Sequence, residues 1–89
     1  MDERIGKIAY SKAGRDKGRP FVIISIVNED FVMLADGDLR KIENPKLKNI
    51  KHIKVTNLIA EDVKLCLIGG KMPENHLIRK NIKKIQEDK

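Results

Sequence analysis

Residues 5–35 of the chain read IGKIAYSKAGRDKGRPFVIISIVNEDFVMLA. This stretch holds three apolar runs, rich in β-branched residues, that are separated by short polar segments. Short apolar runs bounded by turn-forming residues are typical of antiparallel β-strands. We therefore predict strands near Ile5–Tyr10, Phe21–Val27 and Phe31–Ala35, with a tight hairpin at Asn28-Glu29-Asp30.

The sequence that follows this stretch predicts two more strands. A reversal at Asp36-Gly37, where glycine supplies the positive φ, leads into a short strand around Leu39–Ile42. Asn44-Pro45 then favours an extended or turn geometry and interrupts pairing, so we expect the segment ENPKLKN (43–49) to be a surface loop. A last strand is predicted near Ile50–Val55.

Five short strands with such links predict a mainly β fold, a small antiparallel barrel. Closing the sheet into a barrel hides its edges from solvent. This matters for the run FVIISIV, because an exposed edge of that composition would template aggregation.

After Val55 the pattern becomes helical, and we predict two helices. The first ends at Gly69-Gly70, and its apolar face consists of Ile59, Val63, Cys66 and Leu67. The second has Pro73 in its first turn, an apolar face of Ile78, Ile82 and Ile85, and a basic surface of Arg79, Lys80, Lys83 and Lys84. Short helices are marginal alone in water, so we predict a barrel at 1–56 and a helical extension at 57–89 that packs on it.

The composition limits the classes of protein that the chain can belong to. Its 89 residues suffice for one domain with one small core. The 19 Lys and Arg residues outnumber the 13 Asp and Glu residues, and the formal net charge of +6 predicts a polyanionic partner. A single cysteine and the lack of a secretory signal predict a cytoplasmic protein, and the lack of a long apolar run predicts no membrane partner.

The sequence offers little for catalysis. His52 and His76 lie far apart, Cys66 falls on an apolar helix face, and no nucleotide-binding motif or metal-ligand spacing is present. Asp36 and Asp38 flank a glycine turn, where carboxylates more often stabilise the hairpin than bind a cation. We therefore expect no enzymatic activity, no cofactor and no metal site.

The segment SKAGRDKGRP (11–20) places four cations and two glycines between the first two strands. A loop can carry such charge merely because it is solvated. Gly14 and Gly18 favour a binding role, because glycine permits positive φ and lets backbone N–H groups approach a phosphate that the cations neutralise. We interpret this loop as a candidate phosphate-binding site.

A second basic segment, residues 39–54, holds six Lys or Arg residues against one carboxylate, Glu43. In its last strand Ile53 and Val55 are expected to point inward, whereas His52 and Lys54 point to solvent. A lone histidine is more often a structural hydrogen-bonding group or a bystander than a ligand. The segment is the densest positive patch of the sequence, and we predict a binding site there.

The residues GKIAYSKAGRDKGRPFVIISIVNEDFVMLADG (6–37) resemble a KOW motif, with Gly14 at its key glycine and GRDKG as its loop. The stretches DGDLR (36–40) and PKLKNIKHI (45–53) resemble the small KOW-domain RNA-binding proteins of bacteria. Those proteins in turn resemble the archaeal and eukaryotic large-subunit ribosomal protein numbered fourteen. The resemblance implies an SH3-like barrel that binds RNA through the motif loop and the second basic segment.

The resemblance also implies which residues contact RNA. These are Lys12, Gly14, Arg15, Lys17 and Arg19 in the loop, and Arg40, Lys46, Lys48, Asn49, Lys51 and His52 in the second segment. The chain departs from the ribosomal relatives in its helical region after Val55 and in having fewer arginines.

The aromatic content of 3% narrows the kind of nucleic acid. Binders of single strands stack several bases on aromatic side chains, whereas Phe21 and Phe31 are expected in the core and Tyr10 is the one candidate platform. We therefore expect structured RNA, held by phosphate and 2′-hydroxyl contacts. The resemblance implies that this RNA is above all ribosomal RNA and that the role is in translation or ribosome association.

Two alternatives remain open at this point. The chain could be a protein-interaction adaptor of the transcription or translation machinery that contacts ribosomal proteins or RNA polymerase through its helices. Non-specific binding of DNA is a weaker alternative. In each case we expect a monomer when the protein is free.

Overall fold

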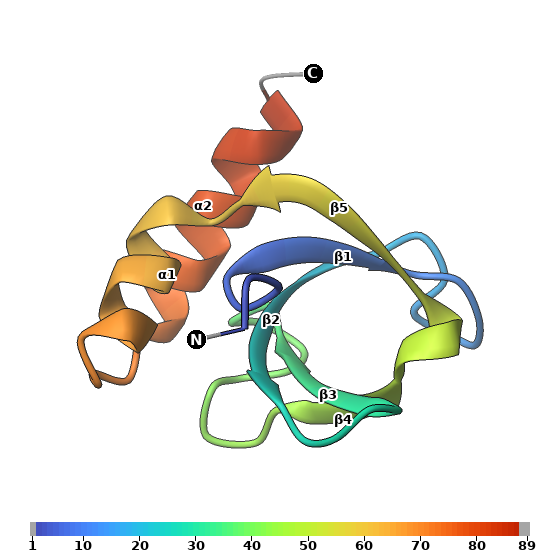
Figure 1. Cartoon of the computed structure of the whole chain (residues 1–89). Coiled ribbons are helices and arrows are strands. Elements are labelled where there is room, and N and C mark those ends of the chain that lie inside the picture. Colours follow the sequence, from blue (N-terminus) through green and yellow to red (C-terminus); the bar gives the residue numbers. More distant parts are fainter. Residues whose placement is uncertain (1, 88–89) are drawn as a thin grey trace.

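The structure, a computed structural model, describes residues 2–87 as five antiparallel strands followed by two helices. The elements are β1 (Lys7–Ser11), β2 (Pro20–Ile26), β3 (Phe31–Ala35), β4 (Lys46–Asn49), a 3-10 turn η1 (Ile50–His52), β5 (Ile53–Ile59), α1 (Glu61–Ile68) and α2 (Asn75–Glu87). The strands form one sheet in the order β4-β3-β2-β1-β5, which curls into a small barrel (Figure 1). The predicted fold class, an SH3-like antiparallel barrel with two C-terminal helices, is confirmed.

The run FVIISIV is apolar in successive positions because β2 is covered on both faces. Phe21 and Ile23 belong to a core cluster inside the barrel, whereas Val22 belongs to a cluster between the sheet and the helices. The inner cluster consists of Ala9, Phe21, Ile23, Val32, Leu34 and Ile53. The outer cluster consists of Ile8, Val22, Ala35, Ile42, Ala60, Val63, Ile78 and Ile82. Neighbouring residues of a strand point to opposite faces, so both faces need cover.

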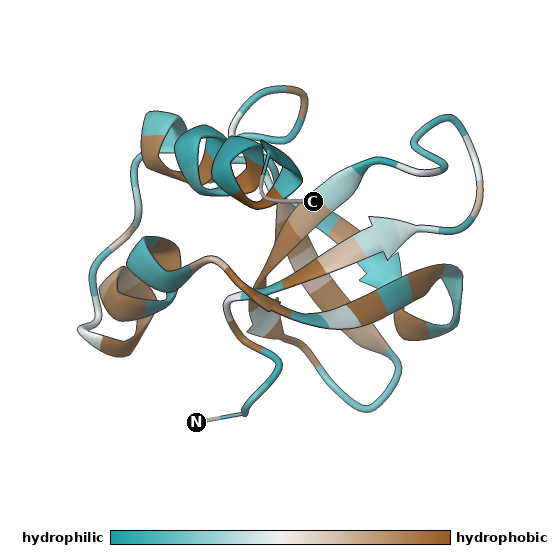
Figure 2. Cartoon of the chain, turned by 90° about the horizontal axis from the view of Figure 1, so that it is seen from above, coloured by the Kyte–Doolittle hydropathy of each residue, from teal (hydrophilic) through white to brown (hydrophobic). Residues whose placement is uncertain are grey.

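The helices cover the outer face of the sheet. Figure 2 shows α2 with its apolar side toward the sheet and its polar side outward. Ile78 and Ile82 are buried and Ile85 is half-buried against the outer cluster, so the predicted apolar face of α2 is confirmed. A helix of this length gains most of its stability from such packing.

Two predictions for residues 39–49 are wrong. Leu39–Ile42 form no strand, because the Asp36 Oδ1 accepts from the amides of Asp38 (3.0 Å) and Arg40 (2.8 Å) and holds the segment in a turn. Lys46–Asn49, predicted as part of a loop, pairs with β3 as β4. The barrel therefore takes its fourth strand from the polar segment after Pro45.

Two predicted boundaries in the C-terminal half also differ from the structure. Ile59, predicted on the first helix, is the last residue of β5, where it pairs with Lys7 of β1. Pro73, predicted in the first turn of the second helix, precedes the first residue of α2, Asn75. The first difference arises because pairing with β1, rather than local propensity, decides where β5 ends. In the second, the amides of Leu77 and Ile78 donate to Glu74 O, so the helical hydrogen bonds begin one residue after Pro73.

Candidate nucleic-acid interface

The loop at residues 12–19 joins β1 to β2 at one end of the barrel (Figure 1). Hydrogen bonds from Ser11 N to Arg19 O (3.1 Å) and from Gly18 N to Ser11 O (2.8 Å) close its neck. Gly14 and Gly18 have φ values of +77° and +85°, so the predicted positive φ is confirmed at both. Apart from chain neighbours, no atom of the described chain lies within 4 Å of a Cβ placed at either glycine, so both face open space.

The tip of this loop presents backbone donors without partners. The amides of Lys17 and Arg19 donate to Gly14 O (3.2 Å) and Asp16 O (2.8 Å). In contrast, the four amides of residues 13–16 donate to no acceptor within residues 2–87. Successive unpaired amides beside cationic side chains are suited to bind phosphate oxygens.

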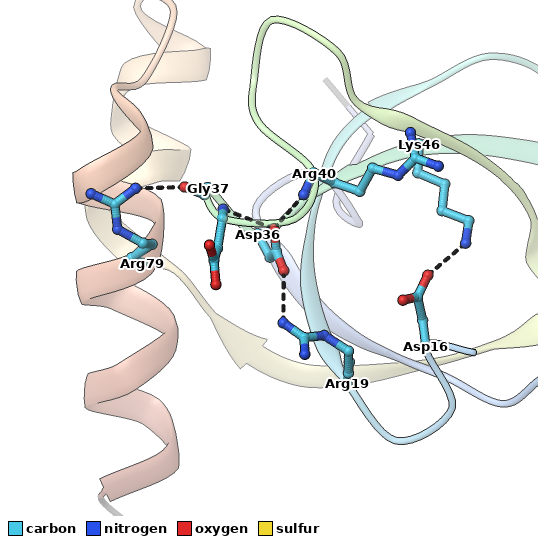
Figure 3. Close-up of polar contacts among 8 residues, drawn as sticks. Asp16, Arg19, Asp36, Gly37, Arg40, Lys46 and Arg79 are labelled. Carbon is cyan, nitrogen blue, oxygen red and sulfur yellow. Dashed lines mark hydrogen bonds and ion pairs between the residues drawn. The ribbon is translucent and has the colours of Figure 1, made fainter. Parts of the chain in front are cut away.

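Two contacts bring the second basic segment against this loop. The amide of Lys12 donates to His52 O (2.8 Å) and so joins the start of the loop to η1. The Nζ of Lys46, on β4, lies 2.6 Å from the Asp16 Oδ2 and joins the loop to the edge of the sheet (Figure 3). Residues that are about 30 to 40 positions apart in the sequence thus share one end of the barrel.

The ion pair of Asp16 and Lys46 also sets the charge of the loop. The hydrogen bond from Lys46 lowers the pKa of the Asp16 carboxyl, and the nearby charges of Lys48 and Arg19 act in the same direction. Partial burial opposes the shift but is outweighed. Asp16 is therefore ionised at neutral pH, and its negative charge is compensated within the protein.

Six predicted site cations make no ion pair with any carboxylate of residues 2–87. They are Lys12, Arg15, Lys17, Arg40, Lys48 and Lys51. Four of them are exposed, whereas Arg40 and Lys48 are half-buried. These side chains leave the protein with uncompensated positive charge near the loop, as a polyanion-binding surface requires.

Three other predicted site residues have partners inside the protein. The Arg19 Nη2 lies 3.4 Å from the Asp36 Oδ2, and Lys46 is paired with Asp16 as described above. The Asn49 Oδ1 accepts from the amide of Lys51 (3.0 Å) and caps η1. The contacts of Lys46 and Asn49 position the loop and the turn, and they leave these two side chains less available to a ligand than the six unpaired cations.

Arg40 lies in a turn that α2 holds in place. The amide of Ile42 donates to the Asn75 Oδ1 (2.8 Å), and Arg79 of α2 donates to the carbonyl of Gly37 (Figure 3). Gly37 has a φ of +77°, and a Cβ there would collide with the backbone oxygen of Asn75. Arg40 lies in this turn, where its amide donates to the Asp36 Oδ1, and Figure 3 shows its side chain extending away from α2, on the side of Lys46.

Sequence reasoning assigned no structural contact to Asp16 and left Lys54 out of the predicted site. Lys54 is exposed on β5, two residues after the exposed His52, and the alternation of the strand already indicated this orientation. The contact of Asp16 with Lys46 spans 30 residues, and no local pattern in the sequence indicates it.

Other kinds of site find little support within residues 2–87. No group of three or more His, Cys, Asp or Glu side chains there could hold a metal ion. No helix of that part of the chain has both the length and the apolar character needed to cross a membrane. Phe21 is buried and Phe31 and Tyr10 are half-buried, so these rings provide no row of exposed stacking platforms.

The chain is similar to three curated proteins over about two thirds of its length. "Large ribosomal subunit protein eL14" of Staphylothermus marinus is 32% identical over 57 residues, which cover 64% of this chain and 59% of that protein. The eL14 protein of Desulfurococcus amylolyticus is 35% identical over 54 residues, which cover 60% of this chain and 55% of that protein. "Putative ribosome-binding protein YbzG" of Bacillus subtilis is 29% identical over 59 residues, which cover 66% of this chain and 80% of that protein.

These similarities confirm the predicted resemblance to the large-subunit ribosomal protein numbered fourteen. The chain spans less than two thirds of the length of the two eL14 proteins that it matches. No protein-family model matches the chain, so the KOW motif stays a prediction.

Proposed function

We propose that the chain binds structured RNA, in particular ribosomal RNA, through the loop at 12–19 and the adjoining segment at 46–54. The observation that carries the proposal is the pair of contacts, Lys12 to His52 and Asp16 to Lys46, that joins two basic segments at one end of the barrel. Six cations near these contacts lack an internal carboxylate partner within residues 2–87. The names of the relatives support the proposal that the chain binds this RNA on the ribosome.

The surface is suited to recognise RNA by shape. The unpaired amides of residues 13–16 and the surrounding cations bind phosphate oxygens, which are present in every sequence. The lack of exposed aromatic rows disfavours single strands, which are gripped by stacking. Double-helical RNA presents phosphates and 2′-hydroxyls in a fixed geometry across its shallow groove, and these groups match a surface rich in donors.

A salt titration tests the proposal directly. We expect the affinity for a folded fragment of large-subunit ribosomal RNA, measured by fluorescence anisotropy, to fall steeply with salt. If about six phosphates are neutralised, the slope of log affinity against log salt is about −4 to −5. A duplex DNA of the same length should compete weakly. A flat salt response, or equal binding of the duplex DNA, would refute the proposal.

A role as a protein-interaction adaptor is the second candidate. The observation that favours it is the exposure of three apolar residues around α1: Leu65, Ile68 and Met72. Exposed apolar residues on a small protein can mark a contact with another protein. An apolar contact depends little on salt, so the same titration distinguishes the two candidates.

A further inference from the structure

A cavity of about 370 Å³ lies between the end of the 12–19 loop, the turn after β3 and the second half of α2. Its walls are Gly18, Arg19, Pro20, Asp36, Ile82 and Gln86. The volume falls within the range of roughly 300–1,000 Å³ that is typical of small-molecule sites. Pro20 and Ile82 provide apolar walls, and Arg19, Asp36 and Gln86 provide a few polar groups, a combination that such sites share.

The polar groups of this cavity have hydrogen-bonding capacity that the protein does not use. The Asp36 side chain is only 6% exposed, and its Oδ1 accepts from two amides of its own turn. Its Oδ2 meets the Arg19 Nη2 at 3.4 Å, which is long for a charge-assisted hydrogen bond. The Arg19 Nε is buried and has no partner in the described chain. An unpaired buried donor is destabilising, so this group lacks a hydrogen-bond partner that the described residues do not supply.

The charges of these groups restrict the ligand. A phosphate would be repelled by the nearly buried carboxylate of Asp36, so the cavity is unsuited to continue the phosphate-binding surface of the loop. A guanine base is neutral and planar, and one edge carries the acceptor O6 beside the donors N1–H and N2–H. Arginine donates to O6 and a carboxylate accepts from ring and amino N–H groups, so Arg19 and Asp36 together match this edge.

We infer that the cavity binds an unpaired guanine of the RNA that the loop holds, an inference that rests on the function proposed above. Gly18 belongs to both the loop and the cavity wall, so a phosphate at the loop and a base in the cavity can come from neighbouring nucleotides. Figure 3 shows Arg19 and Asp36 facing each other beside the turn that α2 holds. Structured RNA offers such bases in bulges and loops, where they can stack on a guanidinium plane and expose their pairing edge.

The test uses RNA hairpins that differ in one bulged nucleotide, together with a hairpin whose stem is uninterrupted. We expect the full chain to bind the hairpin with a bulged guanosine roughly tenfold more tightly than the uninterrupted hairpin, the scale of one stacked and hydrogen-bonded base. Hairpins with a bulged adenosine, cytidine or uridine should bind within about threefold of the uninterrupted one. A bulged uridine that binds as tightly as the guanosine would overturn the inference.

A matched pair of variants locates the effect. Gln86→Trp places a large ring at the cavity wall and should abolish the preference for guanosine while the affinity for the uninterrupted hairpin is unchanged. Asn57→Trp introduces the same ring at an exposed position of β5 outside the cavity and should keep the preference. Thermal midpoints from circular dichroism check the fold of both variants. If Gln86→Trp fails to fold, an NMR experiment on the unmodified chain replaces it. The guanosine hairpin is added, and the signals of the Arg19 Nε–H and the Gln86 amide should shift. Unshifted signals would overturn the inference.

The outcomes separate this inference from the proposed function. Equal binding of the guanosine-bulged and uninterrupted hairpins would overturn the guanine site and leave RNA binding intact. Failure of every hairpin and of the ribosomal RNA fragment to bind would overturn the proposed function, and the guanine site with it.

Discussion

Asn81 of α2 caps the first turn of α1 from a neighbouring helix. Ala60, the residue before α1, has no side chain that could accept the first helical amides. The Asn81 Oδ1 accepts instead from the amides of Asp62 (3.1 Å) and Val63 (3.3 Å), and its Nδ2 donates to the Asp62 Oδ2 (3.0 Å). A cap usually comes from the residue that precedes the helix, so this one also ties α1 to α2.

We expect Asn81→Ala to lower the free energy of unfolding by about 1–2 kcal/mol, because two helical amides lose their acceptor. Urea unfolding followed by circular dichroism measures the change. Lys80→Ala, at the neighbouring exposed position, is the control and should change the free energy by less than about 0.5 kcal/mol. Similar losses in both variants would contradict the capping role.

Arg15 and Lys51 are exposed cations on the two joined segments, and neither forms an ion pair within residues 2–87. We expect Arg15→Glu or Lys51→Glu to weaken binding of the ribosomal RNA fragment by about tenfold at low salt and to leave the thermal midpoint unchanged. Lys71→Glu makes the same charge change at an exposed position between α1 and α2 and should weaken binding much less. An equal loss in Lys71→Glu would show that only net charge matters.

The contact between Asp16 and Lys46 depends on pH. The hydrogen bond from Lys46 lowers the pKa of the Asp16 carboxyl in the folded protein. A carboxyl of this kind contributes stability at a pH above its unfolded pKa, and the contribution is lost as the pH falls through the lower, folded pKa. We expect an NMR titration of Asp16 to have a midpoint below the ordinary value of about 3.9. In Lys46→Met the midpoint should return toward that value, and an unchanged midpoint would contradict the ion pair.

At the scale of elements, α2 holds the turn after β3. Substitutions at two glycines measure how much this contact contributes to the free energy of unfolding. Gly14 and Gly37 share a φ of +77°, but a Cβ at Gly14 meets open space and one at Gly37 meets the backbone of Asn75. We expect Gly14→Ala to lower the free energy of unfolding by about 1 kcal/mol, because only the backbone is strained. Gly37→Ala should cost about 1–3 kcal/mol more, because the first turn of α2 must also shift. Equal losses in urea unfolding would show that α2 does not press on this turn.

The strands with their own apolar pattern were predictable from the sequence, and the polar strand was not. β2 and β3 follow from the runs FVIISIV and FVMLA and from the Asn28 turn between them, where the Asn28 Oδ1 accepts from the amides of Asp30 and Phe31. β4 reads KLKN, and it is a strand because the edge of β3 offers it hydrogen-bonding partners. Pairing of this kind is decided by tertiary context, which local propensity does not report.

For the candidate site, the positions of the charged residues could be predicted from the sequence, but their ion-pair partners within the protein could not. The glycine loop and the lysines of the second segment stand out by composition alone. Asp16 pairs with a lysine 30 residues away in the sequence, and Asp36 pairs with an arginine 17 residues away. Only the folded structure brings these partners into contact. Which cations stay available to a ligand therefore depends on the barrel.

At the scale of the whole molecule, the basic loop and the apolar surface of α1 belong to different parts of the protein. The loop lies at one end of the barrel, and α1 lies with α2 on the outer face of the sheet (Figure 1). Such a separation allows one part to hold RNA while the other is available to a neighbouring protein.

We expect the protein to sediment with large ribosomal subunits on a sucrose gradient of cell lysate at low salt. A wash at about 0.5 M salt should release it, because contacts to phosphate weaken steeply with salt. The variant Arg15→Glu, carried through the same gradient, should move toward the top fractions, whereas Lys71→Glu should stay with the subunits. Migration with RNA polymerase instead would favour the adaptor role.

The order of synthesis gives the outer core cluster a consequence for the nascent chain. The barrel strands emerge before α2, because α2 follows them in the chain. Before α2 has been synthesised, Ile8 and Val22 are not yet covered by Ile78 and Ile82. The nascent barrel therefore exposes an apolar surface that a chaperone can recognise. Folding is complete when α2 packs against the Gly37 turn and buries this apolar surface.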